Sequence, residues 1–289
     1  MTVSVLVPSS LTREAPDKRA ATLKLGYVAR AAAVFRVDRL IVFPDREGER
    51  DATWANGFVE TVLRYATTPP YLRKEVWGER DELAYAGILP PLGVLPQTGS
   101  GSDDSGSLRH GIVTEVGPER RVWVNCGMQH PIAVRLPDNR DVTEGERVTV
   151  RIISRRPVRA RLTDDLSPGP TVECMDLLAA LDDCDHELSI ATAKRGDELT
   201  VGRLNTLSER IETGGLCVAF GAPKRGLSAI LADHPDVDAG ESSSSSFEPG
   251  SAPADRFDLW LNAIPRQGTE TVRTEEAMFA VLACLQLRK

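Results

Sequence analysis

The chain has 289 residues, of which 41% are hydrophobic and 27% are charged, and it carries a net charge of −7. This composition is typical of folded globular proteins and excludes a disordered or fibrous chain. No apolar run approaches the ~20 residues of a membrane span, and residues 1–7 lack the features of a signal peptide. The five cysteines form no C-x-x-C pair and the four histidines do not cluster. We therefore expect a cytoplasmic protein with reduced cysteines, no membrane association and no metal site.

Charge is distributed unevenly along the chain. Residues 109–161 contain eleven arginines and six acidic residues, a net charge of +5, so the remainder carries −12. An acidic chain argues against a nucleic-acid partner, but a basic module within it is suited to phosphate groups.

The first 90 residues alternate between strand and helix patterns. Strands are predicted at 3–7 and 39–43, and helices at 16–35 and 51–65, the second stopped by Pro69 and Pro70. Such alternation predicts a parallel sheet.

The pattern changes after residue 90. Residues 91–107 are rich in Gly, Ser and Pro and predict a flexible loop. Short apolar runs at 111–116, 121–125, 132–136 and 147–153, separated by turn signals, predict four or five short strands within 108–162. Short strands in ~55 residues indicate a small β-barrel.

Alternation resumes after the barrel. Helices are predicted at 173–181, 204–211 and 227–231, and strands at 187–191, 216–220 and 257–261. A serine-rich stretch at 240–254 predicts a flexible loop. The fold class is therefore α/β, with a discontinuous domain, 1–90 and 165–289, interrupted by the barrel.

The most informative stretch runs from Asn262 to Ala277, between the last strand and a helix at 278–285. A connection of this kind needs only a few residues, and ligands bind at the carboxyl ends of parallel strands. Thr274, Glu275 and Glu276 suit a helix N-terminus. The stretch therefore predicts a binding loop.

This stretch resembles the C-terminal signature of the SPOUT (trefoil-knot) RNA methyltransferases, in the branch with a small barrel inserted in the knotted domain. Further matching motifs occur in the expected order along the chain: Ala191–Gly196, Cys217–Leu227, Tyr71–Lys74, His110–Val113 and Val124–Gly127. The middle loop departs from the Gly-Pro-Glu-Gly or Gly-Gly pattern of relatives, since it reads Gly-Ala-Pro-Lys-Arg-Gly at 221–226. The resemblance implies a C-terminal trefoil knot, an OB-like barrel and a homodimer.

The resemblance also implies S-adenosyl-L-methionine as the cofactor and ribosomal RNA as the partner, with methylation of a base such as uridine N3 in large-subunit RNA. The loops after three strands would hold the cofactor, since glycines allow close backbone approach. The alternative is that these are ordinary turns with helix caps. The candidate cofactor-binding residues are Thr192, Arg195, Gly196, Phe220, Gly221, Ala222, Gly226, Asn262, Ile264, Pro265, Gln267, Gly268, Thr269 and Thr274.

Methyl transfer to a ring nitrogen requires that a proton leave. An arginine could stabilise the developing anion, or a carboxylate could accept the proton. The candidates are Arg19, Arg30, Arg273 and Glu275. Each arginine could instead contact phosphate or solvent, and Glu275 could belong to a helix cap.

Candidate RNA contacts are Arg73, Lys74, Arg151, Arg155, Arg156, Arg159 and Arg161. Barrels of the OB type often bind single strands, but arginines on an edge strand can also simply discourage sheet pairing. Arg73 and Lys74 could pack at a hinge. The main alternative to an enzyme is a non-catalytic RNA-binding or ribosome-assembly factor that retains the fold.

Overall fold

The computed structural model describes residues 2–49, 57–94, 107–137, 140–155, 157–163, 169–184, 186–233 and 256–287. The chain divides into two compact units. The first comprises Met1–Arg64, Glu82–Leu92 and Pro170–Lys289, and the second comprises Tyr65–Asp81 and Gly93–Gly169. The serine-rich segment 240–254 and most of the predicted loop 91–107 lie outside the described residues.

The first unit is built on a six-stranded sheet in the order β11-β9-β10-β1-β2-β8, in which every neighbouring pair is parallel. Its strands are β1 Val3–Pro8, β2 Arg39–Phe43, β8 Thr171–Cys174, β9 Leu188–Glu198, β10 Leu216–Ala219 and β11 Leu259–Asn262. Every residue of β1 and β10 is buried, as expected for central strands covered on both faces. The predicted parallel sheet is confirmed.

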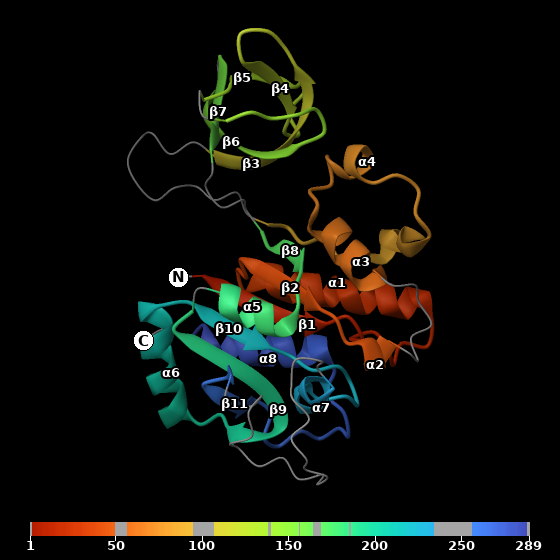
Figure 1. Cartoon of the computed structure of the whole chain (residues 1–289), viewed down its shortest axis with the longest axis vertical. Coiled ribbons are helices and arrows are strands. Elements are labelled where there is room, and N and C mark those ends of the chain that lie inside the picture. The colour runs from red at the N-terminus through yellow and green to blue at the C-terminus, as the bar shows by residue number, and fades with distance from the viewer. Residues whose placement is uncertain are drawn as a thin grey trace. The chain divides into compact units, whose positions relative to one another are not determined.

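Helices pack on this sheet, with α5 in front of the strands and α8 behind them in Figure 1. The helices are α1 Lys18–Val34, α2 Arg46–Glu49, α3 Phe58–Thr67, α5 Leu177–Asp183, α6 Val201–Thr213, α7 Leu227–Ala232 and α8 Thr274–Leu285, with short 3₁₀ turns at Asp81–Leu83 and Ala86–Ile88. Helices α5 and α7 bury Leu177, Leu181 and Ile230 against alternate strand residues such as Leu6 and Ile41. Helix α8 contacts both α1 and α6.

The second unit contains a five-stranded antiparallel sheet in the order β5-β4-β3-β6-β7. Its strands are β3 Ser107–Val116, β4 Arg121–Asn125, β5 Ile132–Arg135, β6 Arg147–Arg155 and β7 Val158–Thr163. Strands β5 and β7, at opposite edges, also contact each other, so the sheet curls towards a barrel. Alternate residues Val148, Val150 and Ile152 enter its core, as the period of two requires. The short helix α4, Arg73–Val76, belongs to the same unit.

The structure corrects two predicted elements. Residues 171–174 form a strand, not the start of a helix at 173, because Arg39–Val42 of β2 offers a free edge that pairs with them. Strand β9 does not end near Ile190 but continues to Glu198, where Asp197 and Glu198 pair with β11 after a register shift. Pairing with a distant strand overrides local pattern in both places.

Within the described residues, no helix is long and apolar enough to cross a membrane.

Candidate functional site

A cavity of about 310 Å³ lies in the first unit, where β9, β10 and β11 meet the start of α8. Small-molecule sites span roughly 300–1,000 Å³, so the volume suits a ligand of modest size. The lining residues are Thr192, Ala193, Lys194, Phe220, Gly221, Ala222, Pro223, Lys224, Arg225, Gly226, Leu261, Asn262, Ala263, Ile264, Gln267, Glu270, Thr271, Val272, Thr274, Ala277 and Val281. They come from three separate segments of the chain, as the sequence predicted.

The cavity has apolar walls. Phe220, Leu261 and Val281 are almost completely buried, and Ile264 and Val272 are half-buried. These apolar side chains share the lining with polar and charged ones, among them Lys194, Gln267 and Glu270. Such a surface suits a flat apolar ring with hydrogen-bonding edges.

Three polar side chains hold the cavity's loops in place. Asn262 donates its Nδ2 hydrogen to the Lys194 carbonyl at 2.7 Å and accepts from the Ile264 amide at 3.0 Å. The Thr192 hydroxyl donates to the Ala219 carbonyl at 2.9 Å. The Thr274 hydroxyl donates to the Gly221 carbonyl at 3.0 Å. The bonds to Lys194, Ala219 and Gly221 each join two different segments of the wall, whereas the Ile264 bond braces one loop, so these side chains fix the shape of the cavity.

The loop after β10 folds back tightly on itself. A Cβ atom on Gly221 would lie 2.7 Å from the Leu227 nitrogen, closer than backbone atoms allow. The turn beyond it closes through a hydrogen bond from the Arg225 amide to the Ala222 carbonyl at 3.0 Å. Lys224 has a φ of 60° in this turn, a left-handed conformation that usually calls for glycine.

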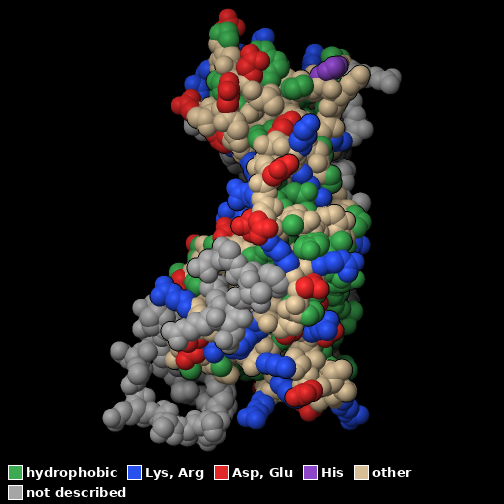
Figure 2. Space-filling model, turned by 90° about the vertical axis from the view of Figure 1, so that its right-hand side faces the viewer, with side chains coloured by type: hydrophobic (Ala, Val, Ile, Leu, Met, Phe, Trp, Pro, Cys, Tyr) green, Lys and Arg blue, Asp and Glu red, His purple; other side chains and the backbone are tan. Residues whose placement is uncertain are grey.

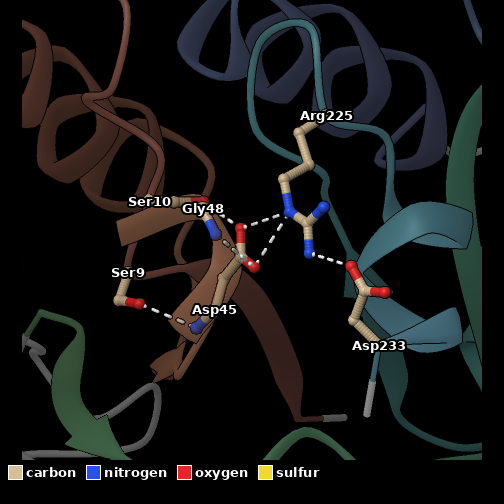
Figure 3. A network of polar contacts seen from close by, with 6 residues as sticks. All are labelled: Ser9, Ser10, Asp45, Gly48, Arg225 and Asp233. Atoms are coloured by element: carbon tan, nitrogen blue, oxygen red, sulfur yellow. Dashed lines mark hydrogen bonds and ion pairs between the residues drawn. The ribbon is translucent and has the colours of Figure 1, made fainter. Parts of the chain in front are cut away.

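A buried carboxylate anchors this turn from the other side (Figure 3). Asp45 follows β2, and both of its carboxylate oxygens accept from Arg225 Nε at 3.0 Å. Arg225 also donates to Asp233 at 2.6 Å. The turn is therefore tied to the loop after β2 as well as to α8.

The structure brings nine of the fourteen predicted cofactor residues to the cavity: Thr192, Phe220, Gly221, Ala222, Gly226, Asn262, Ile264, Gln267 and Thr274. Five others lie outside the lining: Arg195, Gly196, Pro265, Gly268 and Thr269. Gly196 instead allows β9 to approach β11, since a Cβ there would lie 2.7 Å from the Trp260 carbonyl oxygen.

Several lining residues were not among the predicted site residues. Ala277 and Val281 follow Thr274 at the spacing of one helix face, and this spacing could have identified them. Arg225 and Lys224 lie within the quoted middle motif, but the ion pair of Arg225 with Asp45 joins residues 180 positions apart. No local pattern marks that ion pair.

Thr274, Glu275 and Glu276 form the first turn of α8, which confirms the helix N-terminus expected there. Thr274 is the first helical residue and its hydroxyl bonds to Gly221, while Glu276 accepts from the Arg273 amide at 2.9 Å. The capping carboxylate is therefore that of Glu276.

Glu275 is buried beside Lys24, with Nζ and Oε2 3.5 Å apart, and Lys24 also pairs with Glu14. Burial raises the pKa of Glu275 above the ordinary value, although Lys24 opposes this shift. Glu275 does not line the cavity. The contacts that the structure gives Glu275 are therefore those of a buried charge cluster between α1 and α8.

The three candidate catalytic arginines also lie outside the lining. Arg30 on α1 donates to the carbonyl oxygens of Pro91 and Leu92 at 3.0 and 2.5 Å. Arg19 and Arg273 are exposed. Arg30 thus holds the segment after Ala86–Ile88 against α1 within the first unit.

Arg73 is held within the second unit. Its guanidinium donates to the Thr68 and Ala66 carbonyls at 3.0 and 3.1 Å and lies 4.7 Å from the Tyr65 ring centroid. These contacts fix the Arg73 guanidinium against the end of α3. Lys74 is exposed.

The candidate arginines of the barrel lie on β6 and β7 or between them. Arg151 lies opposite Arg161 in the register, and Arg159 lies opposite Ser154. Arg155 ends β6, and Arg156 lies outside the described residues. On the face drawn in Figure 2, Lys and Arg side chains are interspersed with Asp and Glu.

The described residues contain no group of three or more His, Cys, Asp or Glu side chains suited to a metal ion.

Known proteins share this sequence over nearly its whole length. A family model described as "Putative RNA methyltransferase" matches residues 2–285. The chain belongs to this family. The expected membership of an RNA methyltransferase family is therefore confirmed, and the chain is an enzyme of the methyltransferase class.

Individual members of this RNA methyltransferase family are also similar. A protein of Haloarcula marismortui described as uncharacterized is 61% identical over 288 residues, which cover 99% of each chain. The human 28S rRNA (uridine-N(3))-methyltransferase is 28% identical over 317 residues, covering 99% of this chain and 78% of its own length. The mouse enzyme of the same name is 27% identical over 319 residues, covering 99% and 76%.

Proposed function

We propose that this protein transfers a methyl group from S-adenosyl-L-methionine to a base of large-subunit ribosomal RNA, with uridine N3 as the target atom. The observation that carries the proposal is the cavity between the middle of β9, the ends of β10 and β11 and the start of α8, in a member of an RNA methyltransferase family. The proposed target base and atom are those in the names of the human and mouse relatives.

The residues of the cavity fit the proposed donor. Phe220, Leu261 and Ile264 offer apolar surface for the adenine ring, and the backbone of residues 221–226 offers hydrogen-bonding groups beside it. The donor supplies a methyl group already activated on a sulfonium, so the protein's main contribution is to hold both reactants in line. The bonds of Asn262, Thr192 and Thr274 keep that geometry rigid.

Several features of the family resemblance belong to the same proposal. We infer a trefoil knot in the C-terminal part of the first unit and an OB-like topology for the five-stranded barrel, which its curled sheet supports. We also infer a homodimer. Helix α1, which contacts α8, exposes Tyr27 and Val34, two large apolar side chains that a second copy could cover.

The barrel is the proposed RNA-binding surface. Arg151 and Arg161 lie directly opposite each other on neighbouring strands. Two positive charges at adjacent positions suit a phosphate of an RNA backbone. Arg159 and Arg155 extend the same pair of strands.

The catalytic step requires a group that accepts the N3 proton or stabilises the anion that its loss creates. Arg19, Arg30, Arg273 and Glu275 stay candidates, and a second subunit or bound RNA would have to bring them to the cavity.

Calorimetric titration with S-adenosylmethionine tests the proposal. Gly221→Ala should abolish saturable binding, because its Cβ would collide with the Leu227 nitrogen. Gly202→Ala, in α6 and outside the cavity lining, is the matched control, because a Cβ there meets nothing within 4 Å. Wild type and control should then methylate large-subunit RNA, with 3-methyluridine detected by mass spectrometry of its nucleosides.

The opposite result is equally clear. Folded wild-type protein that binds no donor, with or without ribosomal RNA, but still binds the RNA would refute the proposal and favour a non-catalytic RNA-binding factor.

A further inference from the structure

We propose that Asp45 is a positioning residue for methyl transfer, which acts through Arg225 to hold the turn Ala222–Arg225 against the cavity. This inference rests on the proposed function, since it names a residue that shapes the donor site without lining it. Asp45 follows β2, a strand whose loop contributes nothing to the cavity lining.

Several contacts other than the one with Arg225 hold Asp45 in place. Its side chain is only 1% exposed. Its carboxylate accepts from the Ser10 hydroxyl and from the Gly48 amide, the latter at 3.1 Å, while its own amide donates to the Ser9 hydroxyl at 2.9 Å. Figure 3 shows the carboxylate directed at Arg225 from this frame. Two successive loops, after β1 and β2, therefore fix the position of one carboxylate.

Gly48 is part of the same arrangement. A Cβ at this position would lie 2.0 Å from Asp45 Oδ2 and 2.6 Å from the Ser10 Cβ. Only glycine lets the backbone amide come this close to the carboxylate. The loop after β2 is thus built around Asp45.

The charges show that Arg225 is not available as an anion-binding residue. Its guanidinium pairs with Asp45 through Nε and with Asp233 through Nη2, so two carboxylates already balance its single charge. The Asp233 side chain is 47% exposed, whereas that of Asp45 is buried. Exposed ion pairs contribute little, but a buried pair is costly to break. Asp45 is therefore the partner that determines where Arg225 lies.

The position of Arg225 in turn sets one wall of the cavity. The turn is short, closed by the Ala222–Arg225 hydrogen bond, and carries the left-handed Lys224. Thr274 holds its beginning from the side of α8 through Gly221, and Asp45 holds its end from the side of β2. Without Asp45 the turn would keep the attachment through Thr274 and an ion pair with the exposed Asp233, and the lining residues Pro223 and Lys224 would be held less firmly.

The test compares Asp45→Asn with Asp233→Asn in the full-length protein. Asparagine keeps the size of the side chain but brings an amide donor towards the Arg225, Ser10 and Gly48 donors. We expect Asp45→Asn to weaken S-adenosylmethionine binding by about tenfold or more, the scale expected when a buried pair is broken. Asp233→Asn should change it less than about threefold. The affinity for ribosomal RNA should be unchanged in both variants.

Two further measurements distinguish the positioning role of Asp45 from a merely structural role. In an Arg225→Gln background, Asp45→Asn should have little additional effect on the Kd for S-adenosylmethionine, because both act through one contact. Hydrogen exchange in unliganded protein should accelerate for residues 221–228 in Asp45→Asn and not in Asp233→Asn. If Asp45→Asn does not fold, Arg225→Gln alone takes its place against Asp233→Asn.

The outcomes distinguish a failure of the proposed function from a failure of the positioning role of Asp45. Wild-type protein without donor binding refutes the proposed function and the positioning role with it. Wild-type binding that Asp45→Asn leaves unchanged, or losses that simply add in the double variant, overturns the positioning role and leaves the proposed function standing.

Discussion

The buried cluster of Lys24, Glu14 and Glu275 offers a sharp test of the packing between α1 and α8. Replacing Lys24 with methionine keeps the length of the side chain but removes the single cation between two carboxylates. Lys24 is 6% exposed and Glu275 is 7% exposed, so water cannot readily replace the lost charge. Removing one partner of a buried pair costs about 3–5 kcal/mol. We expect a loss of that order in the free energy of unfolding at pH 8.

The loss should depend on pH in a defined direction. Burial raises the pKa of Glu275, and Lys24 opposes that shift, so removing Lys24 should raise the pKa further. A carboxyl group with a raised pKa in the folded state favours folding below its ordinary pKa, and this contribution is lost as the pH rises through the folded-state value. The variant should therefore recover part of its deficit as the pH falls from 8 towards 5.

Denaturant unfolding of wild type and Lys24→Met at several pH values measures both effects. Arg19→Met is the matched control, because Arg19 is exposed on the same helix and surface substitutions usually change stability by less than about 0.5 kcal/mol. Adding Glu275→Gln to Lys24→Met should restore some stability at pH 8. A variant as stable as wild type at pH 8, or a deficit independent of pH, would refute the reasoning.

Two further predictions concern the cavity turn and the barrel. Lys224→Gly should be about 0.5–1 kcal/mol more stable than Lys224→Ala, since only glycine relieves the left-handed conformation; equal melting temperatures would contradict this. Arg161→Gln should weaken binding to ribosomal RNA and lower the slope of log affinity against log salt by about 1, measured by fluorescence anisotropy. Arg36→Gln, the same charge change at an exposed site in the first unit, should leave the slope unaltered.

The alternation of elements could be predicted from the sequence because it depends on local patterns. Short runs rich in valine, such as Val3–Pro8, are typical of strands covered on both faces. Alternating residues such as Val148 and Val150 predict a sheet with one buried face. The ordered glycine-containing segments also identified most of the cavity wall, since Gly221 and Asn262 lie where parallel strands end and Thr274 begins the helix that follows.

Long-range pairing decided what the sequence patterns missed. Strand β9 continues past Ile190 because β11 pairs with it, and Glu173 is in a strand because β2 has a free edge. Asp45 and Arg225 are 180 residues apart in the chain, and each by itself reads as an ordinary surface charge.

Sequence by itself thus determined most of the strands and helices, and two of the loops that reach the carboxyl edge of the sheet, because period and turn chemistry act over a few residues. Tertiary structure decided which charges are buried and paired, as with Lys24 and Glu275, because desolvation depends on every element packed around a group.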